Sequence, residues 1–127
     1  PFLPHTYPER SVAYTGTHDN DTTRGWWEST ASATRHQART YLSCSDEQVV
    51  WAMMGAILES DAMLAIFPLQ DVFELGTEAR MNRPGEPSGN WAWRMDYEML
   101  EPRGEWERLL QLTRSSNRDD AREESNA

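Results

Sequence analysis

Residues 63–69, MLAIFPL, form a near-continuous apolar run that ends in polar residues. Such a run is typical of a β-strand that is buried on both faces, as strands of parallel sheets are. Pro68 is expected near the end of this strand, where a missing amide hydrogen is tolerated. Residues 11–15, SVAYT, predict a second, shorter strand, because β-branched and aromatic residues favour extended backbone.

The sequence predicts helices between these two strands. Residues 23–41 form a polar helical stretch, and a second helix is expected over 45–60, SDEQVVWAMMGAILES. Ser45 and Gln48 have the spacing of a capping box. The apolar face predicted for this helix is made of Val49, Met53, Ala56 and Ile57. Strand, helical connection and apolar strand make one β-α-β crossover, which predicts an α/β fold with parallel strands.

The remaining segments predict loops and one further helix. Residues 1–10 contain three prolines and favour an extended loop, and residues 80–95, RMNRPGEPSGNWAWRM, favour a Pro/Gly-rich one. Residues 105–113, EWERLLQLT, predict an amphipathic helix whose apolar side holds Trp106, Leu109, Leu110 and Thr113. We therefore take residues 1–113 as one unit and expect the polar tail, residues 114–127, to fray.

Composition limits the kind of partner. The formal net charge is -9, from 21 acidic and 12 basic residues, which disfavours nucleic acid and anionic membrane surfaces. No apolar run approaches the roughly 20 residues of a membrane span, and residues 1–10 do not resemble a signal peptide. Cys44 is the one cysteine, which excludes an internal disulfide and suits a cytoplasmic location.

The stretch YTGTHDNDTT, residues 14–23, gathers His18, Asp19, Asn20 and Asp21 just past the first predicted strand. A turn with a helix cap is one interpretation, since Asp, Asn and Thr favour both positions. A metal site is a second, although the chain's other histidines, His5 and His36, have no recognisable ligand spacing. The third is catalysis, because loops after the strands of a β/α barrel carry its chemistry.

Three motifs in this order resemble a known family. They are GTHDNDT (16–22), QDV with LG (70–76), and RMN-x-PG with GNW-x-WR (80–94). Over most of residues 2–95 the chain is similar to the C-terminal part of the 4-α-glucanotransferases of glycoside hydrolase family 77, the amylomaltases. The resemblance implies the C-terminal part of a (β/α)8 TIM barrel, about its last two strands and their helices.

The family is one of retaining transferases, which pass a segment of an α-1,4-glucan to the 4-hydroxyl of an acceptor. The resemblance implies that Asp19 is a third catalytic carboxylate, which holds sugar hydroxyls and helps to distort the ring. It implies that His18 and Asn82 bind the same substrate, and that no cofactor or metal is needed. We interpret Gln70 and Asp71, which follow the second strand, as residues that support either the site residues or the fold.

The chain departs from the family pattern in two places. His5-Thr6-Tyr7 stands where the family often has His-Asn-Tyr, and the motifs of the nucleophile Asp and the acid/base Glu do not occur. We therefore expect the chain alone to be inactive, with the upstream barrel half of the same polypeptide as its partner. A non-catalytic glucan-binding remnant and a fragment of a related α-glucan hydrolase stay open as alternatives.

Overall fold

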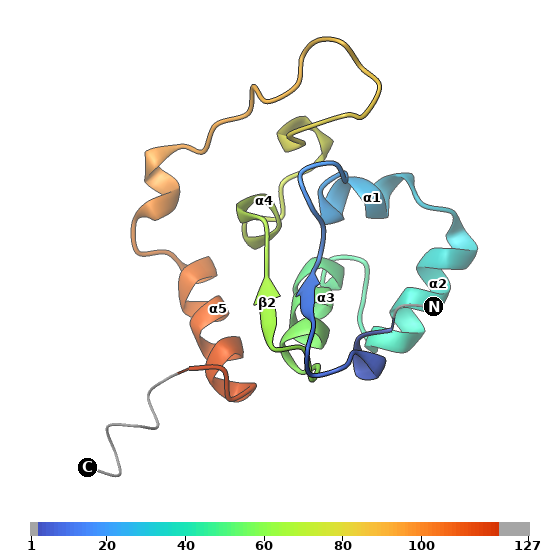
Figure 1. Ribbon diagram of the computed structural model, residues 1–127, viewed down its shortest axis with the longest axis vertical. Helices are drawn as coiled ribbons and strands as arrows, with labels where there is room; N and C mark the ends of the chain where they lie inside the picture. Colours follow the sequence, from blue (N-terminus) through green and yellow to red (C-terminus); the bar gives the residue numbers. More distant parts are fainter. Residues whose placement is uncertain (1–2, 120–127) are drawn as a thin grey trace.

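The computed structural model in Figure 1 describes residues 3–119. Two short strands lie side by side with helices around them. In chain order the elements are η1 (Pro4–Thr6), β1 (Val12–Tyr14), α1 (Thr23–Ser29), α2 (Ser32–Leu42), α3 (Val49–Leu58), β2 (Leu64–Ile66), α4 (Leu69–Val72), η2 (Thr77–Ala79), η3 (Tyr97–Leu100) and α5 (Gly104–Ser115). No helix within residues 3–119 is both long and apolar enough to cross a membrane.

β1 and β2 form a parallel pair, as predicted. Val12 is opposite Leu64, and Tyr14 is opposite Ile66. α3 lies behind the pair in Figure 1 and completes the β-α-β crossover. Ala13 packs with Ile57 and Ala62 on this face, because small side chains let the helix approach the strands closely. The architecture is therefore α/β.

The other face of the strand pair is uncovered. Val12, Tyr14, Leu64 and Ile66 are each more than 40% exposed. The prediction that the strand at 63–69 is buried on both faces is therefore wrong for this chain. Side chains alternate between the two faces of a strand, so Ala13 and Ala65, which lie between these four residues, face α3. The opposite face of the pair remains exposed. The strand is also shorter than its apolar run, because Pro68 and the residues after it enter α4.

α3 supplies most of the core but differs from its prediction. It begins at Val49 and has no side-chain cap; the Ser45 amide donates to Gln48 Oε1 at 3.1 Å, which is half of a capping box. Its apolar residues surround the helix instead of lining one side, so the predicted single face is only partly correct. The buried residues are Val49, Val50, Trp51, Met54, Ile57 and Leu58, whereas Met53 and Ala56 are half-buried.

The polar stretch 23–41 forms two helices instead of one. α1 ends at Ser29, and α2 begins at Ser32 after two residues of extended backbone. The Thr22 hydroxyl accepts from the Gly25 amide at 3.1 Å and so caps α1. This cap fixes where the loop after β1 ends.

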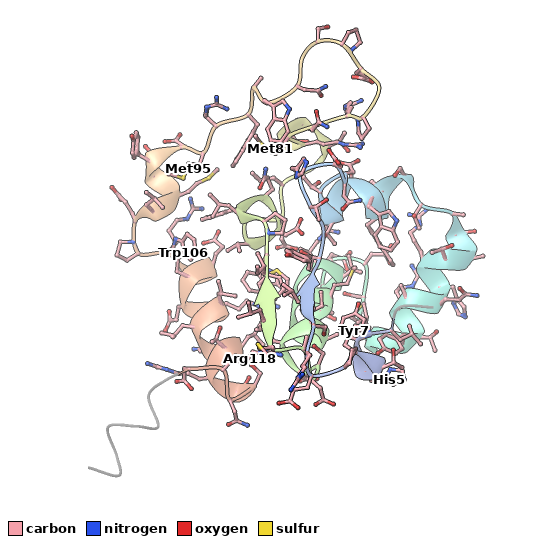
Figure 2. The ribbon with its side chains drawn as sticks, viewed as in Figure 1. His5, Tyr7, Met81, Met95, Trp106 and Arg118 are labelled. Atoms are coloured by element: carbon pink, nitrogen blue, oxygen red, sulfur yellow. The ribbon has the colours of Figure 1, made fainter. Side chains whose placement is uncertain are left out.

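α5 packs its apolar side against the core through Trp106, Leu109 and Leu112. Leu110, predicted on that side, is exposed. Part of the predicted tail is described: α5 continues to Ser115, and Arg118 donates to the carbonyls of Leu58, Ser60 and Ala62 at 2.7–2.8 Å. Figure 2 shows Trp106 and Arg118 at opposite ends of this helix. Residues 120–127 of the predicted tail lie outside the described residues.

Candidate active site

Two segments far apart in sequence meet at the carboxyl end of the strand pair. They are the loop after β1, residues 15–22, and residues 77–82, which include η2. Figure 1 shows both at the end toward which the two strand arrows point. In parallel α/β folds this end carries the binding and catalytic loops.

The turn-and-cap interpretation is correct for part of the polar cluster. Asn20 Oδ1 accepts from the Thr17 amide at 2.8 Å, and the Asn20 amide donates to the Thr17 carbonyl. Asp21 accepts from the Thr22 amide at 2.8 Å and from the Thr77 hydroxyl at 2.8 Å. Asn20 therefore closes the turn, and Asp21 joins the loop to η2. His18 and Asp19 take no part in these bonds.

His18, Asp19 and Asn82, the three predicted site residues, lie together. Asn82 Nδ2 donates to Asp19 Oδ1 at 2.7 Å, and His18 Nε2 lies 3.2 Å from the same oxygen. The side chains of His18 and Asp19 are 56% and 50% exposed. Within the described residues both contacts to the carboxylate go to Oδ1, so Oδ2 can accept a hydrogen bond from a ligand.

Arg80 also joins the two segments. Its Nη2 donates to the Asp19 carbonyl at 2.8 Å, and its Nε donates to the Asn82 carbonyl at 2.9 Å. The Asn82 amide in turn donates to the His18 carbonyl at 3.1 Å. The site is thus a cross-linked pair of loops with an exposed carboxylate, imidazole and amide.

Comparisons with known proteins assign the chain to a family. The model of a protein family described as 4-alpha-glucanotransferase matches residues 1–100. The chain belongs to the 4-alpha-glucanotransferase family. The match confirms the resemblance seen in the sequence, and it covers all the residues of the site.

Individual relatives of this glucanotransferase chain are much longer. It is 52% identical to a 4-alpha-glucanotransferase of Thermus thermophilus over 103 residues, which cover 75% of this chain and 21% of the relative. It is 45% identical to a chloroplastic/amyloplastic 4-alpha-glucanotransferase of Arabidopsis thaliana, covering 75% of this chain and 17% of that protein. The chain thus spans about a fifth of the length of these relatives.

A solved structure matches the fold of the glucanotransferase chain. The amylomaltase from Streptococcus agalactiae in complex with acarbose superposes with a TM-score of 0.86 and 30% sequence identity. The superposition covers 92% of this chain and 24% of that chain. The β-α-β arrangement and the helices around it therefore match one part of a larger enzyme.

Trp91, in the loop that follows Asn82, lies against His18, a contact that the sequence does not predict. Its ring centre lies 5.1 Å from that of His18, and the Trp91 side chain is 51% exposed. The backbone of Trp91 is left-handed, with φ at 60°, a conformation that costs about 1–2 kcal/mol in a residue with a side chain. Its amide donates to the Met81 carbonyl at 2.7 Å, which helps to hold it there. No periodic signal in the sequence links positions 18 and 91.

A cavity of about 500 Å³ lies beside His18, between the loop after β1 and the start of α4. The polar residues His18, Asn20, Asp21, Gln70 and Arg80 line it together with Tyr14 and Ile66. Figure 2 places Met81, another lining residue, at the carboxyl end of the strands. The lining combines apolar surface with hydrogen-bonding groups, which suits a polar organic ligand.

Gln70 and Asp71 are buried instead of facing the cavity mouth. Gln70 Nε2 donates to the Ala79 carbonyl at 3.1 Å. Asp71 is 1% exposed and accepts three hydrogen bonds, from the Thr15 hydroxyl, the Thr23 hydroxyl and the Thr23 amide, at 2.6–2.9 Å. Asp71 therefore joins α4 to the loop after β1 and to the start of α1, whereas Gln70 joins α4 to η2.

Two other chemistries find little support in the described part of the glucanotransferase chain. Residues 3–119 contain no group of three or more His, Cys, Asp or Glu side chains that could hold a metal ion. Burial raises the pKa of the Cys44 thiol, and neighbouring Asp46 raises it further, against the opposing effect of Arg39. An activated cysteine nucleophile needs the opposite shift.

Proposed function

We propose that this chain is the part of a retaining 4-alpha-glucanotransferase that binds the cleaved sugar through Asp19, His18 and Asn82. The observation that carries the proposal is the 2.7 Å bond between Asn82 and Asp19, which joins loops 63 positions apart beside an open cavity. The site supports sugar binding because carboxylates accept from hydroxyls, whereas amides both donate and accept.

Asp19 supplies a third carboxylate to a two-carboxylate reaction. In a retaining transfer, an Asp carboxylate attacks the anomeric carbon while an acid protonates the departing 4-oxygen; the acceptor 4-hydroxyl then displaces the Asp and gives its proton to the same group. Hydrogen bonds from the sugar hydroxyls to Asp19 strengthen as the ring flattens toward the oxocarbenium-like transition state. Such bonds raise turnover more than substrate affinity.

The nucleophile and the acid/base belong to another part of the polypeptide. Neither family motif for them occurs within the 127 residues, so the chain alone is proposed to be inactive. The coverage of about a fifth of the relatives agrees with a large missing portion.

The uncovered face of β1 and β2 is where that portion packs. Val12, Tyr14, Leu64 and Ile66 form an apolar surface on a pair of strands with free edges. A parallel pair is stable only when further strands pair with it and both faces are covered. We propose that the other strands of a (β/α)8 barrel, from the upstream half of the same polypeptide, cover this face and pair with these edges.

The substrates are proposed to be α-1,4-glucans, with no nucleic acid or membrane as partner. The acarbose complex of the Streptococcus agalactiae amylomaltase supports an oligosaccharide-sized ligand in this fold. The net charge of -9 opposes phosphate-rich partners. A cytoplasmic location is proposed as well, because Cys44 is the one cysteine of the 127 residues and no internal disulfide can form among them.

The test is to clone the coding sequence that precedes Pro1 and to compare two proteins, the 127-residue chain and the full-length polypeptide. We expect the full-length protein to convert maltotriose into glucose and longer maltooligosaccharides, and the short chain to do nothing. Release of glucose without longer products would favour the hydrolase. A start codon directly before Pro1, or a folded full-length protein that binds maltooligosaccharides without converting them, would favour the glucan-binding remnant.

A further inference from the structure

We propose that Arg80 is a positioning residue of the transfer reaction, which holds the backbones of Asp19 and Asn82 in the geometry that the sugar requires. The inference rests on the proposed function, since that function gives Asp19 and Asn82 their contact with substrate. Arg80 itself acts through these two residues and does not need to touch the sugar.

The contacts of Arg80 are shared between the two loops. Nη2 donates to the Asp19 carbonyl at 2.8 Å across 61 positions of sequence, and Nε donates to the Asn82 carbonyl at 2.9 Å. A guanidinium holds its five N–H donors in one rigid plane, so these two bonds fix the acceptors relative to each other. A lysine ammonium has no such planar fork.

Both acceptors are main-chain atoms, which gives Arg80 a distinct role from Asn82. The bond from Asn82 Nδ2 to Asp19 Oδ1 orients the two side chains, but rotation about either side chain can break it. Arg80 fixes the chain positions from which those side chains start. Together with the bond from the Asn82 amide to the His18 carbonyl, it sets where Asp19 Oδ2 lies relative to the cavity.

Arg80 is itself anchored on buried structure. It ends η2, and its amide donates to the Thr77 carbonyl at 3.0 Å. The preceding Ala79 is 1% exposed, and its carbonyl accepts from Gln70. The Thr77 hydroxyl donates to Asp21 at 2.8 Å. The base of Arg80 is therefore tied to the loops after both strands, and its guanidinium can transmit that fixed position to Asp19.

The contacts indicate that the direction of the Arg80 N–H donors matters more for its role than the positive charge of its guanidinium. None of the ion pairs within residues 3–119 includes Arg80. Lysine at position 80 would keep the charge and lose the paired donors, whereas glutamine would lose the charge and keep one amide donor. If the two hydrogen bonds position the site, both substitutions should lower kcat to the same degree.

The experiment uses the full-length polypeptide and its conversion of maltotriose. We expect Arg80→Lys and Arg80→Gln each to lower kcat by about 30- to 100-fold, as misplacement by about 1 Å can, with KM changed less than about threefold. In an Asp19→Asn background the same Arg80 substitutions should cost at least about tenfold less, because residues that act as a unit are not additive. The control, Arg118→Lys, removes another guanidinium bonded to carbonyls, far from the site; it should lower Tm and leave kcat unchanged.

The outcomes separate this inference from the proposed function. Absence of transfer by the folded wild-type polypeptide overturns the proposed function, and the inference with it. Wild-type transfer with unchanged kcat in folded Arg80→Lys and Arg80→Gln overturns the inference alone. So does an equal loss in the Asp19→Asn background, because a merely structural residue would cost the same in both. A loss in Arg80→Gln that Arg80→Lys escapes would assign the effect to charge and overturn the paired-donor role.

Discussion

Asp19 and Asp71 each follow one strand of the same parallel pair, but their surroundings are opposite. Asp19 is half exposed and has its contacts at Oδ1, from Asn82 and His18. Asp71 is 1% exposed, with hydrogen bonds to both oxygens from Thr15 and Thr23. The Asp19 carboxylate can still accept hydrogen bonds from a ligand, whereas both oxygens of Asp71 already accept hydrogen bonds from the protein.

The difference shows how the same residue type at equivalent places in a fold can acquire different roles. A buried carboxylate is tolerated only when hydrogen bonds replace its water, and such a group is costly to disturb. An exposed carboxylate keeps its hydration until a ligand displaces it. Asp71 therefore holds the loop that carries Asp19, and of these two carboxylates Asp19 is the one with an exposed oxygen that can accept from a ligand.

The largest expected effect is that of Asp19→Asn in the full-length polypeptide. Amide nitrogen cannot accept from a sugar hydroxyl, so kcat should fall on the order of 10³-fold, the several kcal/mol that such transition-state hydrogen bonds supply. KM should change little, and Tm should stay at the wild-type value. Steady-state kinetics with maltotriose measure the effect.

Asp61 provides the matched control, since it is an exposed aspartate on the connection between α3 and β2. Asp61→Asn removes the same charge and should leave kcat unchanged. If Asp19→Asn changes only KM, the transition-state role of Asp19 is wrong.

Asp71→Asn should lower the stability of the protein and leave kcat almost unchanged, the reverse of Asp19→Asn. Asp71 Oδ2 accepts from both the Thr15 and the Thr23 hydroxyl, and the amide that replaces one oxygen disrupts these bonds. Hydrogen bonds to charged groups contribute about 1.5–3 kcal/mol each, so we expect the free energy of unfolding to fall by about 2–3 kcal/mol. Calorimetry should record a lower Tm, with kcat at 25 °C close to wild type. A large loss of kcat at unchanged Tm would make Asp71 part of the chemistry and end the contrast with Asp19.

The parallel strand pair and the joined site residues could be predicted because each has a local signal. An apolar run followed by polar residues marks the end of a buried strand, and a Pro/Gly-rich stretch marks the loop that carries Asn82. The motifs then placed His18, Asp19 and Asn82 in one family site, and the structure brings the three together.

What the sequence did not predict depends on neighbours that are distant along the chain. The resemblance separates the roles of Asp19 and Asp71, but no local signal predicts the hydrogen bonds from Thr15 and Thr23 that satisfy the buried Asp71 carboxylate. The contact of Trp91 with His18 joins positions that no helical or strand period connects. The exposure of Val12, Tyr14, Leu64 and Ile66 differs from the burial that the apolar run predicts, because composition along a strand does not show what packs on each of its faces.

A smaller effect, on stability, is expected for Gly25→Ala, at the place where the loop after β1 and the start of α1 contact η2. A Cβ on Gly25 would overlap the Thr77 hydroxyl and would lie 2.6–2.7 Å from the Asp21 carboxylate oxygens. The Thr77 hydroxyl donates a hydrogen bond to Asp21, so Gly25→Ala must break this hydrogen bond or move α1. Overpacking of this kind costs about 1–3 kcal/mol in the free energy of unfolding. Thermal unfolding of the full-length variant measures the loss.

Gly55, inside α3, is the matched control. A Cβ at that position meets nothing within 4 Å. Gly55→Ala should therefore stabilise the protein by about 0.5–1 kcal/mol, the usual gain of alanine over glycine in a helix. Equal effects at the two glycines would show that the contact of Asp21 with Thr77 does not constrain the loop beside Asp19.

Chelation should have the smallest effect, and it tests whether the exposed carboxylate binds sugar or metal. Asp19 and His18 are both potential ligands, yet Asp19 Oδ1 accepts from the Asn82 amide nitrogen, a donor that competes with a cation for the same oxygen. Transfer between carboxylates and sugar hydroxyls proceeds by proton movement and needs no ion. We therefore expect prolonged dialysis of the full-length polypeptide against EDTA to leave kcat and KM for maltotriose unchanged. Activity that is lost on dialysis and restored by one divalent cation, and not by others, would assign His18 and Asp19 to a metal site instead.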